Sequence, residues 1–381
     1  MKPFNIPFNK PFIVGKELFY IAQAVIENRH TAGDGPFTNK CQDWLEKRLA
    51  CRKVFLTHSC TAALEMAAIL AGIQPGDEII MTSFTFVSTA NAFVLRGGIP
   101  VFVDIRPDTL NINEKLIEEA LTSKTRAIVP VHYAGVSCNM DAIMEIAKRR
   151  QLLVIEDAAQ ALLSQYRERY LGTIGHMACL SFHETKNIIS GEGGALLIND
   201  PSVIERAEII REKGTNRSQF FRGVEDKYTW VDIGSSYLPS DILAAFLYAQ
   251  MENADQIIAK RNLIYNLYME GLRPLAEKGY IQLPLISNDC RCNSHLFYII
   301  TQSLDERTDL IKFLGEHGIL AVFHYVPLHN SPAGQLYGRA GGPLDVTQRV
   351  SDCLLRLPLY YEMTRENVQY VISKISRFYE E

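Results

Sequence analysis

Between residues 53 and 198, short apolar runs alternate with segments of helical periodicity, and this alternation limits the possible folds more than any other feature. Buried strands that alternate with helices form a mostly parallel sheet covered by helices on both faces. We therefore predict an α/β protein with a seven-stranded sheet sandwiched by helices. The expected strands are 54–56, 78–81, 100–103, 127–131, 152–155, 177–181 and 195–198, and helices are expected at 61–71, 85–96, 114–121 and 140–150.

The last two strands enclose a turn that carries Lys186. No helical pattern lies between them, whereas a parallel return needs a crossover of about a dozen residues or more. We therefore expect one antiparallel strand beside this turn. A lysine held between core strands is displaced from water, which lowers its pKa and makes the amine a nucleophile toward carbonyl groups.

The remaining chain predicts a second, smaller domain. The polar and aromatic segment 214–240 is long for a loop in a compact protein, which is typical of a functional segment. A long helix at 241–272 is expected to lead into an α+β domain, so we place a large domain with an N-terminal arm at 1–250 and a small domain at 251–381. Further helices are expected at 16–28, 38–49 and 201–213.

Composition excludes several classes of partner. The net charge of −4 and the lack of a basic cluster give no reason to expect nucleic acid. No apolar run reaches about 18 residues, so we expect no membrane span. The first residues, Met1–Asn5, do not show the apolar core of a signal peptide, so we expect none. The eight cysteines lack metal-ligand spacing, which favours reduced thiols in the cytoplasm and no metal site.

Ligands of such sheets bind outside the carboxyl ends of the strands. The segment 57–62 ends a strand and starts a helix, where hydroxyls and N–H groups bind phosphate or form an ordinary cap. Phe86 follows the next strand and either stacks on a flat ring or packs in the core. Asp157 ends a buried strand, where a carboxylate needs a cationic ring nitrogen, a helix end or a salt bridge.

These strand ends, together with Ser181, His183 and Lys186, match the needs of pyridoxal 5′-phosphate (PLP). The lysine holds the aldehyde as a Schiff base. The aspartate keeps the pyridine nitrogen protonated, so that the ring withdraws electrons.

Several motifs resemble the DegT/DnrJ/EryC1/StrS sugar aminotransferases over nearly the whole chain. They are Val131–Gly135, Glu156–Gln160, Ser181–Asn187, Gly191–Gly194, Phe323–His329 and Leu355–Tyr360. The resemblance implies PLP-dependent fold type I and amination of a nucleotide-linked keto-sugar with glutamate as donor. It also implies a homodimer with sites shared between subunits. Segments 213–223 and 227–237 resemble a branch that aminates dTDP-4-dehydro-6-deoxy-D-glucose.

The resemblance also implies roles for single residues. Lys186 is the Schiff-base lysine and proton-transfer base, and His183 lies beside it as a second catalytic candidate. Asp157 meets the pyridine nitrogen and Gln160 the ring hydroxyl, while Phe86 stacks on the ring. The phosphate is expected near Ser59, Cys60, Thr61 and Ser181, and the substrate near Tyr133, His324 and His329. Ser236 replaces an asparagine that, in relatives, reaches the phosphate from the partner subunit.

Alternatives remain for several of these interpretations. The two histidines at 324 and 329 fit ordinary packing in the small domain equally well. The protein could act on another nucleotide-linked keto-sugar. A PLP-dependent sugar dehydratase is disfavoured because dehydratases of the family replace the lysine with histidine, and Lys186 is present. A non-enzymatic sensor would need a binding module for which the chain has no spare residues.

Overall fold

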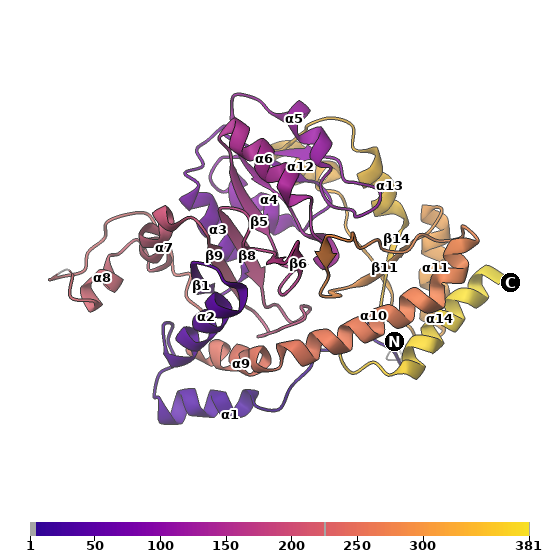
Figure 1. Ribbon diagram of the computed structural model, residues 1–381, viewed down its shortest axis with the longest axis horizontal. Helices are drawn as coiled ribbons and strands as arrows, with labels where there is room; N and C mark the ends of the chain where they lie inside the picture. The colour runs from indigo at the N-terminus through magenta and orange to yellow at the C-terminus, as the bar shows by residue number, and fades with distance from the viewer. Residues whose placement is uncertain (1–4, 225, 381) are drawn as a thin grey trace.

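A computed structural model describes residues 5–224 and 226–380, and its centre is an eight-stranded sheet (Figure 1). The strand order is β1-β9-β8-β5-β4-β2-β3-β13. These strands are β1 (Lys53–Thr57), β2 (Glu78–Thr82), β3 (Ile99–Val103), β4 (Thr125–Val129), β5 (Leu153–Asp157), β8 (Met177–Ser181), β9 (Gly194–Ile198) and β13 (Arg339–Ala340). All seven strands expected from the sequence are present, and the α/β class is confirmed.

Strand β9 runs antiparallel to both of its neighbours, β1 and β8, whereas the other pairs of the sheet are parallel. The antiparallel strand expected beside Lys186 is therefore confirmed. The eighth strand, β13, was not expected, because two residues are too few to show any periodicity. It brings the C-terminal part of the chain onto the edge of the large sheet beside β3.

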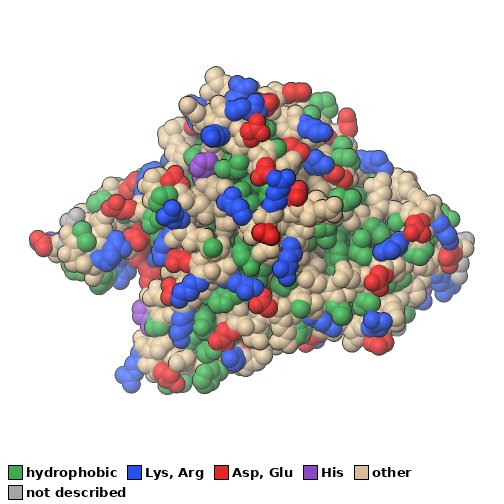
Figure 2. All heavy atoms as spheres, viewed as in Figure 1, with side chains coloured by type: hydrophobic (Ala, Val, Ile, Leu, Met, Phe, Trp, Pro, Cys, Tyr) green, Lys and Arg blue, Asp and Glu red, His purple; other side chains and the backbone are tan. Residues whose placement is uncertain are grey.

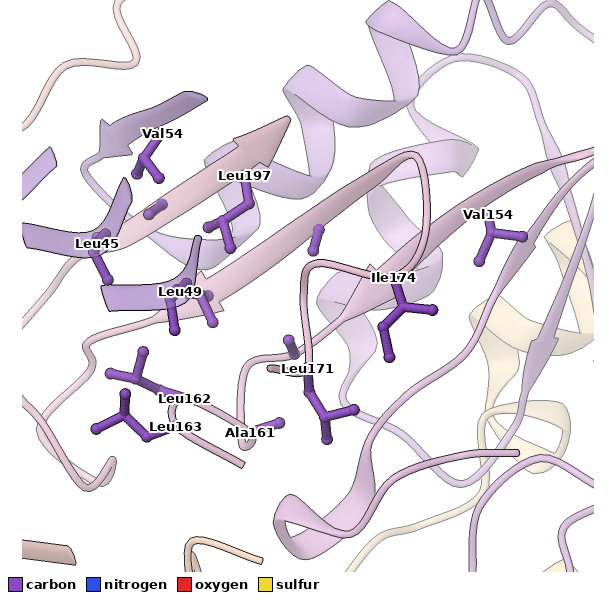
Figure 3. Packing of buried hydrophobic residues seen from close by; sticks show 14 of the residues in the cluster. Leu45, Leu49, Val54, Val154, Ala161, Leu162, Leu163, Leu171, Ile174 and Leu197 are labelled. Carbon is purple, nitrogen blue, oxygen red and sulfur yellow. The ribbon is translucent and has the colours of Figure 1, made fainter. Parts of the chain in front are cut away.

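Helices cover both faces of the sheet because alternate strand residues point to opposite sides. In β1, Val54 and Leu56 face one core with α2, and Phe55 faces the other with α3. Figure 3 shows the first core, where Leu45 and Leu49 lie near β1 and β9. The helices of this part are α1 (Glu17–Ala22), α2 (Pro36–Leu49), α3 (Cys60–Leu70), α4 (Val87–Val94), α5 (Ile117–Ala120), α6 (Met140–Arg150), α7 (Ile204–Arg211) and α9 (Asp241–Glu252).

A second, antiparallel sheet of order β11-β14-β12 lies in the C-terminal part. The helices and strands of this C-terminal part are α10 (Ala254–Glu277), β11 (Phe297–Ile300), α11 (Leu304–Glu316), β12 (Val322–Phe323), α12 (Pro332–Tyr337), α13 (Asp345–Cys353), β14 (Leu354–Leu357) and α14 (Arg365–Glu380). Helix α10 joins the two parts, since Ile257 packs in the first core and Ile264 in the core of the small sheet. The boundary at residue 250 stays a prediction.

The expected long helix at 241–272 is two helices, α9 and α10, because Asn253 leaves helical geometry with φ −110° and ψ 11°. The expected helix at 16–28 continues past α1 as a π-helix, Gln23–Glu27. Helix α8 (Arg217–Phe221) lies in the described part of segment 214–240 and projects from the body, at the left of Figure 1. Figure 2 shows the same projection, and the chain returns to the core at Tyr237. A small third sheet joins β6 (Gln165–Tyr166), β7 (Arg169–Tyr170) and β10 (Cys290–Arg291).

Candidate active site

A cavity of about 850 Å³ lies beyond the carboxyl ends of β1, β2, β5 and β8. The structure brings most of the residues predicted from the sequence together in its lining. They are Ser59, Cys60, Thr61, Phe86, Asp157, Gln160, Ser181, His183, Lys186 and His324. The small sheet closes the other side through Phe323 and Arg356, and the N-terminal segment adds Phe8 and Asn9.

Lys186 lies in the turn between β8 and β9, where its N–H donates to the carbonyl oxygen of His183 (2.9 Å). Burial lowers the pKa of its amine below the usual value of 10.5. The nearby Cys60 and Asp157 act in the opposite direction, and Arg356 adds to the lowering. The amine is thus freer to act as a nucleophile than that of a lysine in water.

Asp157 ends β5 and is fixed by two hydrogen bonds. The hydroxyl of Thr89 donates to one carboxylate oxygen (2.7 Å), and the N–H of Ala159 donates to the other (3.1 Å). The Thr89 hydroxyl lies 2.9 Å from that of Thr85, which precedes α4 by two residues. The carboxylate is therefore held at one orientation, in which it can accept a further hydrogen bond from a protonated ring nitrogen.

Two residues are placed to contact a planar ring near Asp157. Gln160 accepts the N–H of Ala134 (2.7 Å) and donates to the hydroxyl of Tyr325 (3.1 Å). Its amide carries a second N–H, which suits a ring hydroxyl. Phe86 caps α4 and remains 58% exposed in the cavity wall, so its ring offers a stacking surface.

The first turn of α3 forms an anion cradle. Ser59 is the N-cap and accepts the N–H of Ala62 (3.1 Å), while the N–H groups of Cys60 and Thr61 have no partner within the helix. A helix start of this kind favours phosphate. A Cβ at Gly194 would lie 2.4 Å from the backbone nitrogen of Cys60, so glycine is needed for β9 to pass the cradle.

His183 lies at the cavity edge, and its Nδ1 accepts the N–H of Thr185 (3.3 Å). His324 is buried, and its Nδ1 lies 3.0 Å from the hydroxyl of Tyr133. Burial holds the pKa of His324 well below its usual range, so this ring is neutral. The catalytic role expected of His183 stays a proposal.

Three expected residues lie outside the lining formed by the described residues. Tyr133 is 1% exposed and lies behind two lining residues, His324 and Tyr325. His329 lies 2.6 Å from the hydroxyl of Ser83. Ser236 is exposed and pairs with Glu212 at the base of the extended segment. A phosphate contact by Ser236 would thus need a second subunit.

The sequence prediction missed Thr89, Tyr325 and Arg356. In the helix expected at 85–96, the spacing of Thr85 and Thr89 places both on one face, which could have signalled the pair. Arg356 interrupts the apolar run from Leu354 to Leu359, where a charge is unusual. Tyr325 offers no signal, because its role depends on the distant Gln160.

The residues present fit PLP, since one cavity holds a phosphate cradle, an aromatic ring for stacking, a fixed carboxylate and an amine that loses its proton readily. Within residues 5–224 and 226–380, no cluster of three or more His, Cys, Asp or Glu side chains is arranged to hold a metal ion. In the same part of the chain, no helix has both the length and the apolar character needed to cross a membrane.

Comparison with protein families matches residues 13–376 to the DegT/DnrJ/EryC1/StrS aminotransferase family. The chain is 30% identical over 375 residues to the GDP-perosamine synthase of Escherichia coli O157:H7, with 98% of each protein covered. It is 31% identical over 381 residues to the spore coat polysaccharide biosynthesis protein SpsC of Bacillus subtilis, covering 97% and 96%. The PLP form of Spr1654 from Streptococcus pneumoniae superposes with a TM-score of 0.90 at 25% identity, covering 99% of each chain.

Proposed function

Because the chain belongs to the DegT/DnrJ/EryC1/StrS aminotransferase family, whose enzymes depend on PLP, we propose that it aminates dTDP-4-dehydro-6-deoxy-D-glucose. Glutamate is the amine donor, and the product is dTDP-4-amino-4,6-dideoxy-D-galactose. The transaminase activity that corresponds to this reaction is EC 2.6.1.59. The product would serve enterobacterial common antigen or a related surface polysaccharide.

The observation that carries the proposal is the position of Lys186 in one cavity with Asp157 and the α3 cradle. When bound, PLP supplies an aldehyde carbon that takes up the amino group and a ring that withdraws electrons from the reacting carbon. Lys186 would supply the amine that holds the cofactor and would then act as the base for a 1,3-proton shift between the two carbons bonded to the transferred nitrogen. Asp157 fixes the ring nitrogen, and Gln160 orients the ring.

The choice of sugar rests on segments 213–223 and 227–237, which resemble the branch acting on the dTDP-linked 4-keto sugar. The similarity to a GDP-perosamine synthase supports a second candidate, in which the substrate is a GDP-linked keto-sugar. A sugar dehydratase would lack the lysine, so Lys186 favours transamination over that alternative.

We also propose a cytoplasmic homodimer whose sites are completed by the partner subunit, with Ser236 near the cofactor phosphate. The exposed position of Ser236, outside the cavity of its own chain, supports a contact with a second copy. All eight cysteines are free, as suits a reducing compartment.

Product analysis tests the reaction. The purified protein with PLP and glutamate is given the dTDP-, GDP- and UDP-linked 4-keto sugars separately, and the products are identified by mass spectrometry and by NMR at C4. We expect amination of the dTDP sugar with axial nitrogen, and loss of turnover in Lys186→Ala but not in Lys115→Ala, which removes an exposed lysine. Turnover of the GDP sugar alone would establish the second candidate instead.

A further inference from the structure

The cavity has more positive than negative side chains. Its lining includes Lys186, Arg261 and Arg356, against the carboxylates of Asp157 and Glu192. Among the residues that the structure describes, neither arginine forms an ion pair. Arg261 is satisfied in another way, because its guanidinium donates to the carbonyl oxygens of Ser294 and His295. Arg356 has no comparable partners.

Arg356 belongs to β14, between the buried Leu355 and Leu357. Within residues 5–224 and 226–380, its one hydrogen bond is long, 3.4 Å from Nη2 to the carbonyl oxygen of Phe323. Its Nε is buried without any acceptor. The side chain as a whole is partly buried, and a guanidinium offers five N–H donors, so its other N–H groups remain available in the cavity. This arginine therefore has N–H donors that can bind an anion in the cavity.

The N-terminal segment holds the guanidinium in place. The ring of Phe8 lies 4.6 Å from the guanidinium carbon, as in a cation–π contact. The segment is fixed on either side of Phe8, since Ile6 forms a bridge with Ile319 and Asn9 donates to the carbonyl oxygen of Glu184 (3.2 Å). Phe8 thus restricts the guanidinium to one side of the cavity.

Arg356 and Lys186 line the same cavity, together with His324 and Asp157. In keeping with this, the charge of Arg356 adds, after burial, to the lowering of the pKa of Lys186 and of His324. In an amino acid, the α-carboxylate is bonded to the carbon that carries the amino group, so it stays beside the reacting atoms. In a nucleotide sugar, the whole pyranose ring separates the diphosphate from the C4 ketone. An anion next to Lys186 therefore suits the amino acid better than the nucleotide.

We propose that Arg356 binds the α-carboxylate of the amine donor through its free N–H groups, and that Phe8 is the positioning residue for this guanidinium. The inference rests on the proposed function, in which glutamate is the donor. A planar guanidinium and a carboxylate form two parallel hydrogen bonds, which fixes the orientation of the donor as well as its affinity.

The test follows the donor half-reaction of the PLP-loaded protein by the absorbance of the cofactor, without any sugar. Glutamate is compared with 4-aminobutanoate, which lacks only the α-carboxylate, and with glutamine, which lacks the γ-charge. We expect Arg356→Gln to raise the half-saturating glutamate concentration about 10- to 100-fold, the range for a hydrogen bond to a charged group. The preference for glutamate over 4-aminobutanoate should collapse, while that over glutamine is unchanged.

Three further variants sharpen the result. Arg356→Lys should recover part of the glutamate affinity. Phe8→Ala should raise the same half-saturating concentration with little change in the limiting rate, and Phe8→Tyr should restore it. Arg307→Gln is the matched control, because Arg307 also has a buried Nε without an acceptor but does not line the cavity.

The reverse pattern overturns the inference. If Arg356→Gln weakens the nucleotide-sugar half-reaction and leaves glutamate unaffected, the anion is a phosphate of the nucleotide. The inference is also overturned if Arg356→Gln loses the preference for glutamate over glutamine. The same holds if Arg356→Gln raises the half-saturating glutamate concentration no more than Arg307→Gln does. The proposed function fails separately, when the wild-type protein reacts with glutamate but aminates none of the 4-keto sugars.

Discussion

At the scale of single residues, the low pKa of the Lys186 amine has a measurable consequence. The folded protein holds this amine neutral at a lower pH than the unfolded chain does, since the folded pKa lies below 10.5. The unfolded state therefore binds more protons below 10.5, and the stability of the cofactor-free protein rises with pH through that window. We expect the rate of PLP capture by the cofactor-free protein to rise with pH, with a midpoint below 10.5.

Stopped-flow absorbance at a series of pH values measures that midpoint. Lys186→Ala should show no covalent capture at any pH, while Lys115→Ala should follow the wild-type curve. A midpoint at or above 10.5 would contradict the desolvation of the amine.

The hydroxyl of Thr89 is a second residue whose effect can be isolated. Thr89→Val keeps the shape of the side chain and removes the hydrogen bond to Asp157, which leaves the carboxylate free to rotate. A hydrogen bond to a charged group contributes about 1.5–3 kcal/mol, so we expect the PLP dissociation constant to rise by about 10-fold or more. Equilibrium dialysis measures it, with the exposed Thr308→Val as control. Unchanged retention in both variants would show that Ala159 alone orients Asp157.

At the scale of elements, the β8–turn–β9 unit was predictable, because its apolar runs and the missing crossover both lie within a short stretch of sequence. The strand-end residues were predictable for the same local reason. Arg356 and Phe8 were not, because they reach the cavity of Lys186 only through the long-range packing of the small sheet and the N-terminal segment beside the large sheet. The break at Asn253 was missed because both flanking segments favour helix.

The close passage of β9 by the α3 cradle gives an element-scale prediction. Gly194→Ala would place a Cβ 2.4 Å from the backbone of Ser59 and Cys60, so β9 and the start of α3 must separate. We expect a loss of about 2 kcal/mol or more in the free energy of unfolding, as for overpacked sites, together with weaker PLP binding. Urea denaturation and dialysis measure the two effects.

Gly315→Ala serves as the matched variant. Its Cβ would meet no atom within 4 Å and it lies in α11, where alanine favours the helix by about 0.5–1 kcal/mol. If Gly194→Ala were as stable as Gly315→Ala, the cradle would not depend on this close approach.

At the scale of the whole molecule, the part of the chain around α8 projects from the body (Figure 1), and the described residues between 214 and 236 carry exposed aromatic side chains. Among them, Trp230 is 76% exposed and Phe221 is 68% exposed. Phe221 and Tyr228, which is also exposed, both contact the ring of Phe220, and grouped apolar side chains of this kind are typical of a surface that contacts another protein. This segment also carries Ser236, so a dimer built through it would bring Ser236 toward a second subunit.

Mixed dimers test whether the site is shared. Ser236→Asp should abolish PLP retention by repelling the phosphate, and Lys186→Ala should abolish turnover, so each variant is inactive alone. After unfolding and refolding together, a mixed dimer contains one site with both native residues. Random pairing of equal amounts then restores about a quarter of the wild-type activity if Ser236 acts in the partner's site. If Ser236 acts within its own chain, no site combines both native residues and the mixture stays inactive. If Ser236 contacts no phosphate, Ser236→Asp alone keeps its activity.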